Sequence, residues 1–300
     1  MARVVKKVEE ANCITHSGTM HADEVFATAF LDMYLGERNV FRTNIVPDNI
    51  NPNTLVYDVG RGKYDHHQPE AVKRENGITY CAFGLLWQEF GRDFLKKQDI
   101  EYVEDVFLGI DKDLVEYIDA DDNGFFPKIE AKYNVKTLPG IIKIFNPSYL
   151  ADEDESTQFE KAVKLARSIL EEEILYINGK VYAEKQINEL LGDLTENDKF
   201  IILNTYLPYE ETILNSDKTS NLLFIAFPSN RGGYAIKTLP KSTEDKTARL
   251  DFPEEWAGLE GKDLQEISGI KGLTFCHTGR FIVSCKDLDT VYEVFDKIIK

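Results

Sequence analysis

Two short segments hold four of the five histidines in this 300-residue chain, and both also carry aspartate. The first is THSGTMHADE (residues 15–24), with His16, His21 and Asp23, and the second is YDVGRGKYDHHQ (residues 57–68), with Asp58, Asp65, His66 and His67. A single histidine beside a loop is most often a surface residue or a satisfied core group. Four of the five histidines in two acid-bearing segments are harder to explain as surface or core residues, so we interpret them as metal ligands.

A third segment, IDADDNG (residues 118–124), adds the carboxylates of Asp119, Asp121 and Asp122. By itself this segment is a weak signal, because a solvated helix end would look similar. Together the three segments offer imidazole and carboxylate ligands, which suit borderline and harder divalent ions, notably Mn²⁺. Two such ions about 3.5–4 Å apart would need a shared ligand, which Asp58 could provide. Together the two ions would stabilise the attacking and leaving oxygens of an in-line displacement at phosphorus.

Two other chemistries are disfavoured. A structural Zn²⁺ site would be expected to include cysteine pairs, but Cys13, Cys81, Cys276 and Cys285 are scattered and form no CxxC motif. A serine hydrolase of the α/β class would carry a GxSxG nucleophile elbow, and the sequence has none. We therefore expect Cys13 and Cys81 to be reduced thiols with a structural role.

The two histidine segments are each predicted to follow a strand. Residues 12–15 could end a short buried strand just before His16, and residues 53–60 form a strand that ends at Asp58. Strands that alternate with helices favour an α/β domain in which helices flank a parallel sheet. Ligands gather at the carboxyl ends of the strands in such a sheet, so both segments are expected at that edge.

Apolar periodicity predicts three helices around this sheet, at residues 25–34, 77–91 and 102–118. Ser17 or Thr19 would cap the first of them. Its first turn carries acidic residues, which the helix dipole stabilises at that end. The third helix runs directly into the IDADDNG segment.

A domain boundary is indicated after residue 150, where an acidic segment precedes a long helical stretch that ends near residue 193. New strand signals follow at 199–205, 222–228 and 233–239. We expect a metal-binding catalytic domain at 1–150, a helical connector at 151–195, and a smaller α+β substrate-binding domain at 196–300.

The formal net charge of −17 argues against a broad nucleic-acid groove or an anionic membrane surface as partner. It does not exclude a short phosphorylated substrate held by metal ions, because bound cations can dominate the local field. No alternation of aromatic and basic residues of the kind that binds single strands stands out. No segment approaches 18 consecutive apolar residues and no signal region opens the chain, so a cytoplasmic protein is expected.

The triplet Asp65-His66-His67 resembles the signature of the DHH phosphoesterases, the superfamily of RecJ-type exonucleases and manganese-dependent inorganic pyrophosphatases. The closer resemblance is to the melanocyte-proliferating-gene family of predicted metal-dependent hydrolases. That family has the same order of motifs: THSGTMHADE, VYDVGRGKYDHHQ, IDADDNG, and PEEWAGLEGKDL followed by SGIKGLTFCHTGRFI near the C-terminus. The resemblance extends from about residue 13 to residue 283.

This resemblance implies a DHH-like N-terminal domain that binds two divalent ions, Mn²⁺ or alternatively Mg²⁺, and hydrolyses phosphodiesters. In the eukaryotic branch the activity is a 3′→5′ RNA exonuclease. The matching positions imply metal ligands at His16, His21, Asp23, Asp58, His66 and Asp119, with Asp122 as an equally good match for the last of them. Asp58 would bridge the ions, His67 would face the substrate, and Asp65 and Arg280 would complete the catalytic set.

The C-terminal motif departs from the family pattern. The family usually reads HASGFIGG, whereas this chain reads HTGRFIVS, so that Val283 and Ser284 replace two glycines. Side chains then occupy the path by which backbone would approach a phosphate, and Arg280 could compensate with a bidentate contact. We expect His277, Gly279 and Arg280 to bind substrate, with His277 and Arg280 facing the metals across a cleft between the domains.

Three functions remain open at this stage. The leading one is hydrolysis of short RNA or oligonucleotides by metal-activated water. The alternatives are a nucleotide-sensing or regulatory metalloprotein with little turnover, and a purely structural metalloprotein. The expected partner is a small phosphorylated molecule or a short RNA, with no membrane, and self-association is left open.

Overall fold

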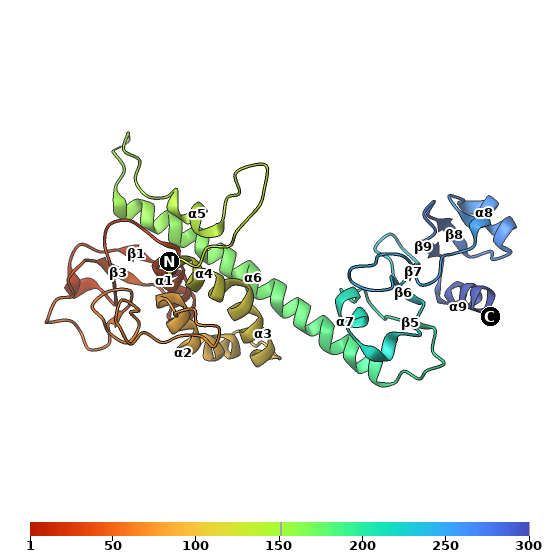
Figure 1. The fold of residues 1–300 in the computed structure, drawn as a ribbon, viewed down its shortest axis with the longest axis horizontal. Coiled ribbons are helices and arrows are strands. Elements are labelled where there is room, and N and C mark those ends of the chain that lie inside the picture. The colour runs from red at the N-terminus through yellow and green to blue at the C-terminus, as the bar shows by residue number, and fades with distance from the viewer. Residues whose placement is uncertain (151, 300) are drawn as a thin grey trace. The chain divides into compact units, whose positions relative to one another are not determined.

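The computed structural model describes residues 1–150 and 152–299. Ala151 and Lys300, the first residue of the expected connector and the last of the expected C-terminal domain, lie outside the described residues. The chain forms two compact units, Met1–Val181 and Tyr182–Lys300, which divide within the long helix α6 (Glu155–Gly192) (Figure 1). The three-part division expected from the sequence stays a prediction.

The first unit contains a four-stranded sheet in which every strand pair is parallel. Its strands are β1 (Arg3–Val4), β2 (Cys13–Thr15), β3 (Asn39–Arg42) and β4 (Leu55–Val56), in the order β1-β3-β2-β4. Ile14 on β2 lies opposite Phe41 on one side and Val56 on the other. The predicted parallel α/β architecture is thereby confirmed, and β2 and β4, which precede the two histidine segments, are neighbours.

Helices surround this sheet. They are α1 (Ala22–Leu35), α2 (Ala82–Lys97), α3 (Val103–Ile110), α4 (Glu116–Asp122) and α5 (Leu138–Lys143), with a short 3₁₀ turn at Val8–Glu10. A π-helical turn, Asp111–Val115, joins α3 to α4 into one continuous helical run. A mid-helix π segment of this kind often lies near a functional site, and this one leads into the predicted acidic segment.

Two local sequence expectations were wrong. The helix expected at 77–91 begins at Ala82, because Lys73 pairs with Thr79 across a turn in which Gly77 takes a φ of 88°. The cap of α1 is His21, rather than Ser17 or Thr19. There the Glu24 carboxylate accepts the backbone N–H of His21 at 3.0 and 3.1 Å, so the first turn satisfies its own donor.

The core of the first unit is built around α1, which is buried along most of its length. Phe30 on α1 makes edge-to-face contacts with Trp87 and Phe94 on α2, and Trp87 stacks on Phe107 of α3. Apolar residues are distributed around α1, as expected of a core helix, although it also buries Asp23, Glu24 and Asp32. Because α1 starts inside the first histidine segment, that segment is attached to a helix that is buried along most of its length.

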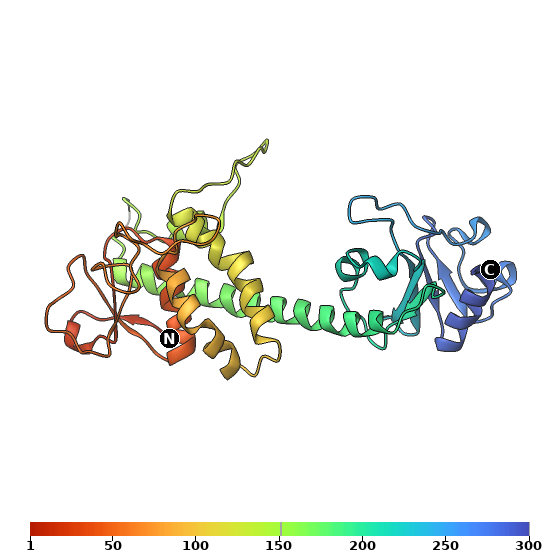
Figure 2. The same cartoon turned by 60° about the horizontal axis from the view of Figure 1, so that its bottom comes forward.

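The second unit contains a five-stranded mixed sheet in the order β5-β6-β7-β9-β8, in which β5 and β6 are parallel and the other pairs antiparallel. The strands are β5 (Phe200–Ile202), β6 (Phe224–Pro228), β7 (Tyr234–Thr238), β8 (Leu273–Cys276) and β9 (Ile282–Cys285). The helices are α7 (Glu210–Leu214), α8 (Gly261–Ser268) and α9 (Leu288–Ile298), with 3₁₀ turns at Asp217–Thr219 and Glu254–Trp256. A second α+β region at the C-terminus is therefore confirmed (Figure 2).

All four cysteines are free and buried. Burial raises the pKa of Cys13 to about 12, and it raises the pKa of Cys81 well above the usual thiol range. Since the thiolate is the reactive form, we expect both thiols to resist a thiol reagent in the native protein and to react after unfolding. Rapid labelling of either one in the native state would contradict this expectation. Among the described residues, no helix is both long and apolar enough to span a membrane.

Candidate metal centre

The first histidine segment is a turn that joins β2 to α1 and is held from outside. The Arg42 guanidinium donates to the His16 carbonyl at 3.1 Å and to the Gly18 carbonyl at 3.2 Å, and it pairs with Glu155 at 2.6 Å. Glu155 in turn accepts the backbone N–H of Gly18 at 3.0 Å. Held in this way, the His16 and His21 rings lie with their centroids 5.5 Å apart.

The second segment is a tight loop between Asp58 and Asp65. The backbone N–H of Asp58 donates to the Tyr64 carbonyl at 2.9 Å, which closes the loop. Gly60 inside it has a φ of 84°, and a Cβ there would lie 2.7 Å from a methyl carbon of Val46. Asp58 itself takes a φ of 56°, a left-handed conformation that non-glycine residues rarely adopt outside functional or tightly constrained sites.

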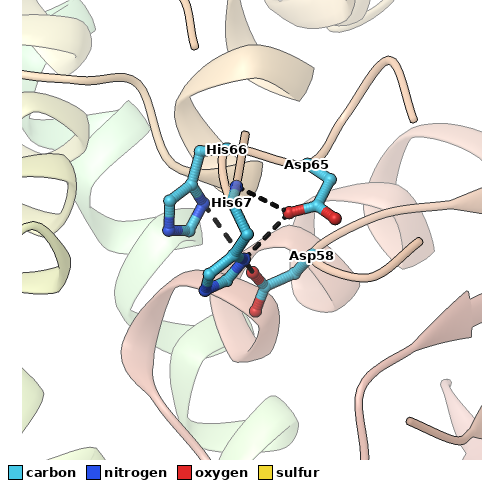
Figure 3. Close-up of side chains that lie close together, drawn as sticks. All are labelled: Asp58, Asp65, His66 and His67. Carbon is cyan, nitrogen blue, oxygen red and sulfur yellow. Dashed lines mark hydrogen bonds and ion pairs between the residues drawn. The ribbon is translucent and has the colours of Figure 1, made fainter. Parts of the chain in front are cut away.

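This loop brings the DHH triplet against Asp58, and Figure 3 shows the His66 and His67 rings turned toward its carboxylate. Asp58 Oδ1 lies 3.7 Å from His66 Nδ1 and 3.5 Å from His67 Nδ1. Its other oxygen, Oδ2, lies 3.2 Å from His16 Nε2. Asp58 therefore faces both histidine segments at once.

Four groups of side chains in the described part of the chain have ligand atoms close enough to hold a metal ion. They are Asp58-Asp65-His66-His67, His16-His21-Glu24, His21-Asp23-Asp122 and Asp23-Glu24-Asp58. In each group the ligand atoms lie within 4.8 Å of one another. The groups share Asp58, Glu24, His21 and Asp23. They therefore form one connected cluster, which could hold more than one ion.

Several buried polar atoms in this cluster have no hydrogen-bond partner in the described chain. They are His16 Nε2, both carboxylate oxygens of Asp23, Asp58 Oδ1 and His66 Nδ1. Leaving a buried polar atom unpaired costs free energy, and buried carboxylates without a partner cost most. These unpaired atoms are carboxylate oxygens and imidazole nitrogens, each of which can offer a lone pair to a metal. The residues present therefore fit divalent cations.

The electrostatics of the cluster agree with this fit. Burial, together with repulsion from three neighbouring carboxylates, raises the pKa of Asp23 well above its usual range. Burial alone would lower the pKa of His16, but the Asp58 and Glu24 carboxylates outweigh it and raise the pKa to about 10. Both shifts report an excess of buried negative charge, which a bound cation would neutralise.

Asp65 has a different environment from the other aspartates. Its carboxylate accepts the backbone N–H groups of Arg61 at 2.6 Å and His67 at 3.0 Å, and it pairs with His67 Nδ1 at 2.8 Å. Burial opposes ionisation, but these hydrogen bonds prevail and lower the pKa of Asp65. The ring of His67 is 63% exposed, so Asp65 orients an imidazole whose Nε2 is left for contacts outside the loop.

The structure separates the two aspartates that the sequence left as alternatives. Asp122 lies in the cluster, with Oδ2 at 2.9 Å from His66 Nε2. Asp119 belongs to none of the four groups found among the described residues. It is fully buried, with Oδ1 accepting the backbone N–H of Cys81 at 3.0 Å and Oδ2 accepting Arg74 Nε at 2.7 Å. This geometry favours Asp122 as the ligand.

Substitution of the two aspartates should separate metal binding from stability. We expect Asp122→Asn to weaken Mn²⁺ binding by more than about 10–100-fold, the range typical of losing only an outer-shell partner. Asp119→Asn should keep the metal but lower the free energy of unfolding by about 1–3 kcal/mol, because buried donors lose a charged acceptor. Metal analysis and urea unfolding of both variants would check this, and the reverse pattern would restore Asp119 as the ligand.

Sequence reasoning missed two residues that belong to the site. Glu24 is fully buried and lies 3.4 Å from His16 Nε2, whereas the sequence indicated only a favourable place for it in the first turn of α1. Arg42, 3.8 Å from Glu24, supplies a buried cation beside the acidic cluster. The spacing His21-Ala-Asp-Glu24 matches a capping box and could have indicated Glu24, but nothing local indicates Arg42.

The C-terminal candidates lie in the turn between β8 and β9. The backbone N–H of Gly279 donates to His277 Nδ1 at 2.9 Å, and that of Arg280 to the His277 carbonyl at 2.9 Å. The Arg280 guanidinium contacts Asp251 Oδ2 at 3.3 Å and the Phe252 carbonyl at 3.3 Å. These contacts are all within the second unit, and the expected approach of Arg280 and His277 to the metals stays a prediction.

A family model for MYG1 exonucleases, described as an uncharacterised protein family (UPF0160), matches residues 12–299. This stretch is almost the whole chain, and the chain therefore belongs to this family. The resemblance to the melanocyte-proliferating-gene family inferred from the motifs is thereby confirmed.

Curated relatives come from a yeast, a bacterium and mammals. A MYG1 protein of Saccharomyces cerevisiae is 27% identical, over 93% of this chain and 93% of its own length. A MYG1 protein of Chlamydia trachomatis is also 27% identical, over 95% of this chain and 96% of its own. The MYG1 exonuclease of Homo sapiens is 27% identical, over 89% of this chain and 80% of its own. The comparison with solved structures found no match.

Proposed function

We propose that this chain is a divalent-metal-dependent phosphodiesterase that shortens oligonucleotides as an exonuclease. The observation that carries the proposal is the connected cluster around Asp58 and Asp23, in which several buried polar atoms, both Asp23 carboxylate oxygens among them, have no hydrogen-bond partner among the described residues. The name exonuclease, borne by relatives such as the human protein, supports the same reaction class.

Two Mn²⁺ ions are the proposed cofactor. Imidazole and carboxylate ligands without thiolate favour Mn²⁺, with Mg²⁺ as the alternative. His16, His21, Asp23, Asp58, His66 and Asp122 would hold the ions, and Glu24 would join them. When bound, such a pair lowers the pKa of water and neutralises charge on a phosphoryl group. Asp58 faces both histidine segments, so we assign it the shared position.

His67 is proposed to contact the substrate. Asp65 accepts from its Nδ1, which fixes the ring and leaves Nε2 on the exposed side. In its charged form the imidazole would donate from Nε2 to a phosphate oxygen and so stabilise charge in the transition state. Asp65 acts here through His67, as a positioning residue.

The proposed substrate is a short RNA or oligonucleotide, cleaved from its 3′ end. A net charge of −17 disfavours extended binding to long nucleic acid. The second unit is proposed to hold the rest of the substrate through His277, Gly279 and Arg280, because a phosphodiester is cleaved efficiently only when both sides of the scissile group are positioned.

The test is hydrolysis by chelator-treated protein to which Mn²⁺ is returned. Two substrates are used: bis(p-nitrophenyl) phosphate, and a short RNA labelled at its 5′ end. We expect Mn²⁺-dependent turnover of both, with labelled products that shorten stepwise from the 3′ end. Asp58→Asn should turn over neither substrate, whereas Asp296→Asn, at an exposed position on α9, is its matched control and should behave like wild type. Tight Mn²⁺ binding without turnover of either substrate would refute the proposal and favour a regulatory metalloprotein.

A further inference from the structure

The segment between α4 and α5 is an exposed loop of unusual composition. Residues 125–136 read FFPKIEAKYNVK, and every one of them is exposed. Figures 1 and 2 both show this stretch, which we name the 125–136 loop, extending away from the helices that flank it. The side chains of Phe126 and Tyr133 are 69% and 76% exposed. Single exposed apolar residues are common, but Phe125, Phe126, Ile129 and Tyr133 are exposed together on one segment, and such a group calls for an explanation.

The same loop carries positive charge in an acidic chain. Lys128, Lys132 and Lys136 alternate with the aromatic residues, and Glu130 is the one acid among them. None of the three lysines has an ion-pair partner among the described residues. This alternation of aromatic and basic groups is the pattern of single-strand binding sites, where bases stack on rings and lysines meet phosphates. The alternation does not stand out from the sequence alone, because exposure is what separates these rings from core residues.

The loop begins beside the metal cluster, within the same unit. Asp122, at 2.9 Å from His66, ends α4, and Gly124 with a φ of 77° turns the chain out of the helix. The backbone N–H of Phe125 donates to the Ala120 carbonyl at 2.8 Å, which anchors the start of the loop. Three residues of chain span at most about 11 Å, so Phe125 cannot lie far from the cluster.

We propose that the 125–136 loop binds single-stranded nucleic acid next to the metal centre, with bases stacked on Phe125, Phe126 and Tyr133 and phosphates on the lysines. The inference rests on the proposed function and names its substrate class. A purely apolar partner surface would leave three unpaired lysines unexplained. A folded acidic protein as partner would account for the lysines, but not for the aromatic rings spaced between the lysines.

The test measures binding in the presence of chelator, where no strand is cut. The aromatic variant combines Phe126→Leu with Tyr133→Leu, which keeps apolar surface but removes the rings. The lysine variant combines Lys128→Gln, Lys132→Gln and Lys136→Gln. Fluorescence anisotropy is recorded with a short adenine homopolymer as RNA and as DNA. We expect the aromatic variant to bind both strands at least about tenfold more weakly than wild type. For the lysine variant, the slope of the logarithm of the binding constant against the logarithm of the salt concentration should be smaller by about 2.

Two controls separate this inference from the proposed function. Tyr176→Leu with Lys161→Gln changes an exposed ring and an exposed lysine on α6 and should leave strand binding unchanged. Bound Mn²⁺, measured without chelator, should be equal in all variants, because none of the substituted residues belongs to a ligand group.

If wild type hydrolyses the reporter but both loop variants bind strands as wild type does, the loop inference is wrong and the proposed function stands. If wild type hydrolyses nothing while the loop variants lose strand binding, the loop inference stands and the proposed function fails. If the loop variants lose self-association but still bind strands as wild type does, the loop is a contact between copies of the chain and the inference is overturned.

Discussion

Asp58→Asn should abolish hydrolysis, metal binding and the stabilisation of the folded chain by Mn²⁺ together. Asp58 lies within reach of His16, His66 and His67 and belongs to two of the ligand groups. An amide cannot bridge two cations as a carboxylate can, so we expect turnover to fall by far more than the roughly 10–100-fold seen for outer-shell changes.

The stability of the metal-free chain should change less, because Asp58 has two opposed effects there. Its charge repels Asp23, which is buried beside it. It also pairs with His16 and raises the pKa of that imidazole, so its loss removes a favourable contact as well. Wild type should gain further stability when Mn²⁺ is added, because the ion binds the folded state, and the variant should not.

Thermal unfolding with chelator and with excess Mn²⁺, alongside metal analysis, measures both effects. Asp296→Asn serves as the exposed control and should follow wild type in each. A variant that retained its metal and its Mn²⁺-dependent stabilisation would remove Asp58 from the shared position.

The meeting of the two histidine segments could be anticipated from the sequence for a physical reason. Each segment follows a strand, and in a parallel sheet the carboxyl ends of adjacent strands share one edge. The structure places β2 and β4 side by side, with Ile14 opposite Val56. His16 and Asp58, which come two residues after these positions, therefore emerge together.

What could not be anticipated depends on burial and on long-range pairing. Asp119 and Asp122 are three residues apart on one helix and so share a face, which is why the sequence could not choose between them. What favours Asp122 is that Arg74, 45 residues from Asp119 in the chain, pairs with the Asp119 carboxylate. Likewise, the rings of Phe126 and Tyr133 suggest a core by composition, and only the fold shows them exposed.

The fold also decides where elements begin. Apolar periodicity predicted a helix from residue 77, yet the chain from 73 to 79 is committed to a turn by the positive φ of Gly77. In that turn Arg74 donates its backbone N–H to the Ile78 carbonyl at 2.7 Å. The turn thus presents the Arg74 side chain to α4, and the later helix start is part of how the site is supported.

Arg74→Ala should cause the largest loss of stability among the substitutions considered. The Arg74 guanidinium is buried and joins two carboxylates: it contacts Asp119 Oδ2 at 2.7 Å and both oxygens of Asp111, at 2.6 and 2.9 Å. Removing one partner of a buried ion pair leaves the other charge uncompensated and costs about 3–5 kcal/mol. We expect urea unfolding to report a loss of this size.

Arg92→Ala is a closely matched control. Arg92 makes two hydrogen bonds of 2.7 Å to Glu104, so its geometry resembles that of Arg74, but the side chains of this pair are 40% and 58% exposed. Both guanidinium groups also lie over an aromatic ring, Arg92 over Phe107 and Arg74 over Tyr80, so this contact is lost in both variants. Exposed pairs of this kind contribute about 0–1 kcal/mol. Equal losses in the two variants would show that burial of the Arg74 pair does not set its energy.

Arg74→Ala should also weaken the metal centre, although Arg74 lies in none of the ligand groups. Arg74 ties α4, which carries Asp122, to the chain that follows His66 and His67. Loss of such a support typically lowers metal affinity by about 10–100-fold. Mn²⁺ titration under conditions where the variant is folded would measure this. An Arg74→Ala chain that is strongly destabilised but binds Mn²⁺ as tightly as wild type would show that the π-helical run and α1 position the ligands without help from this ion pair.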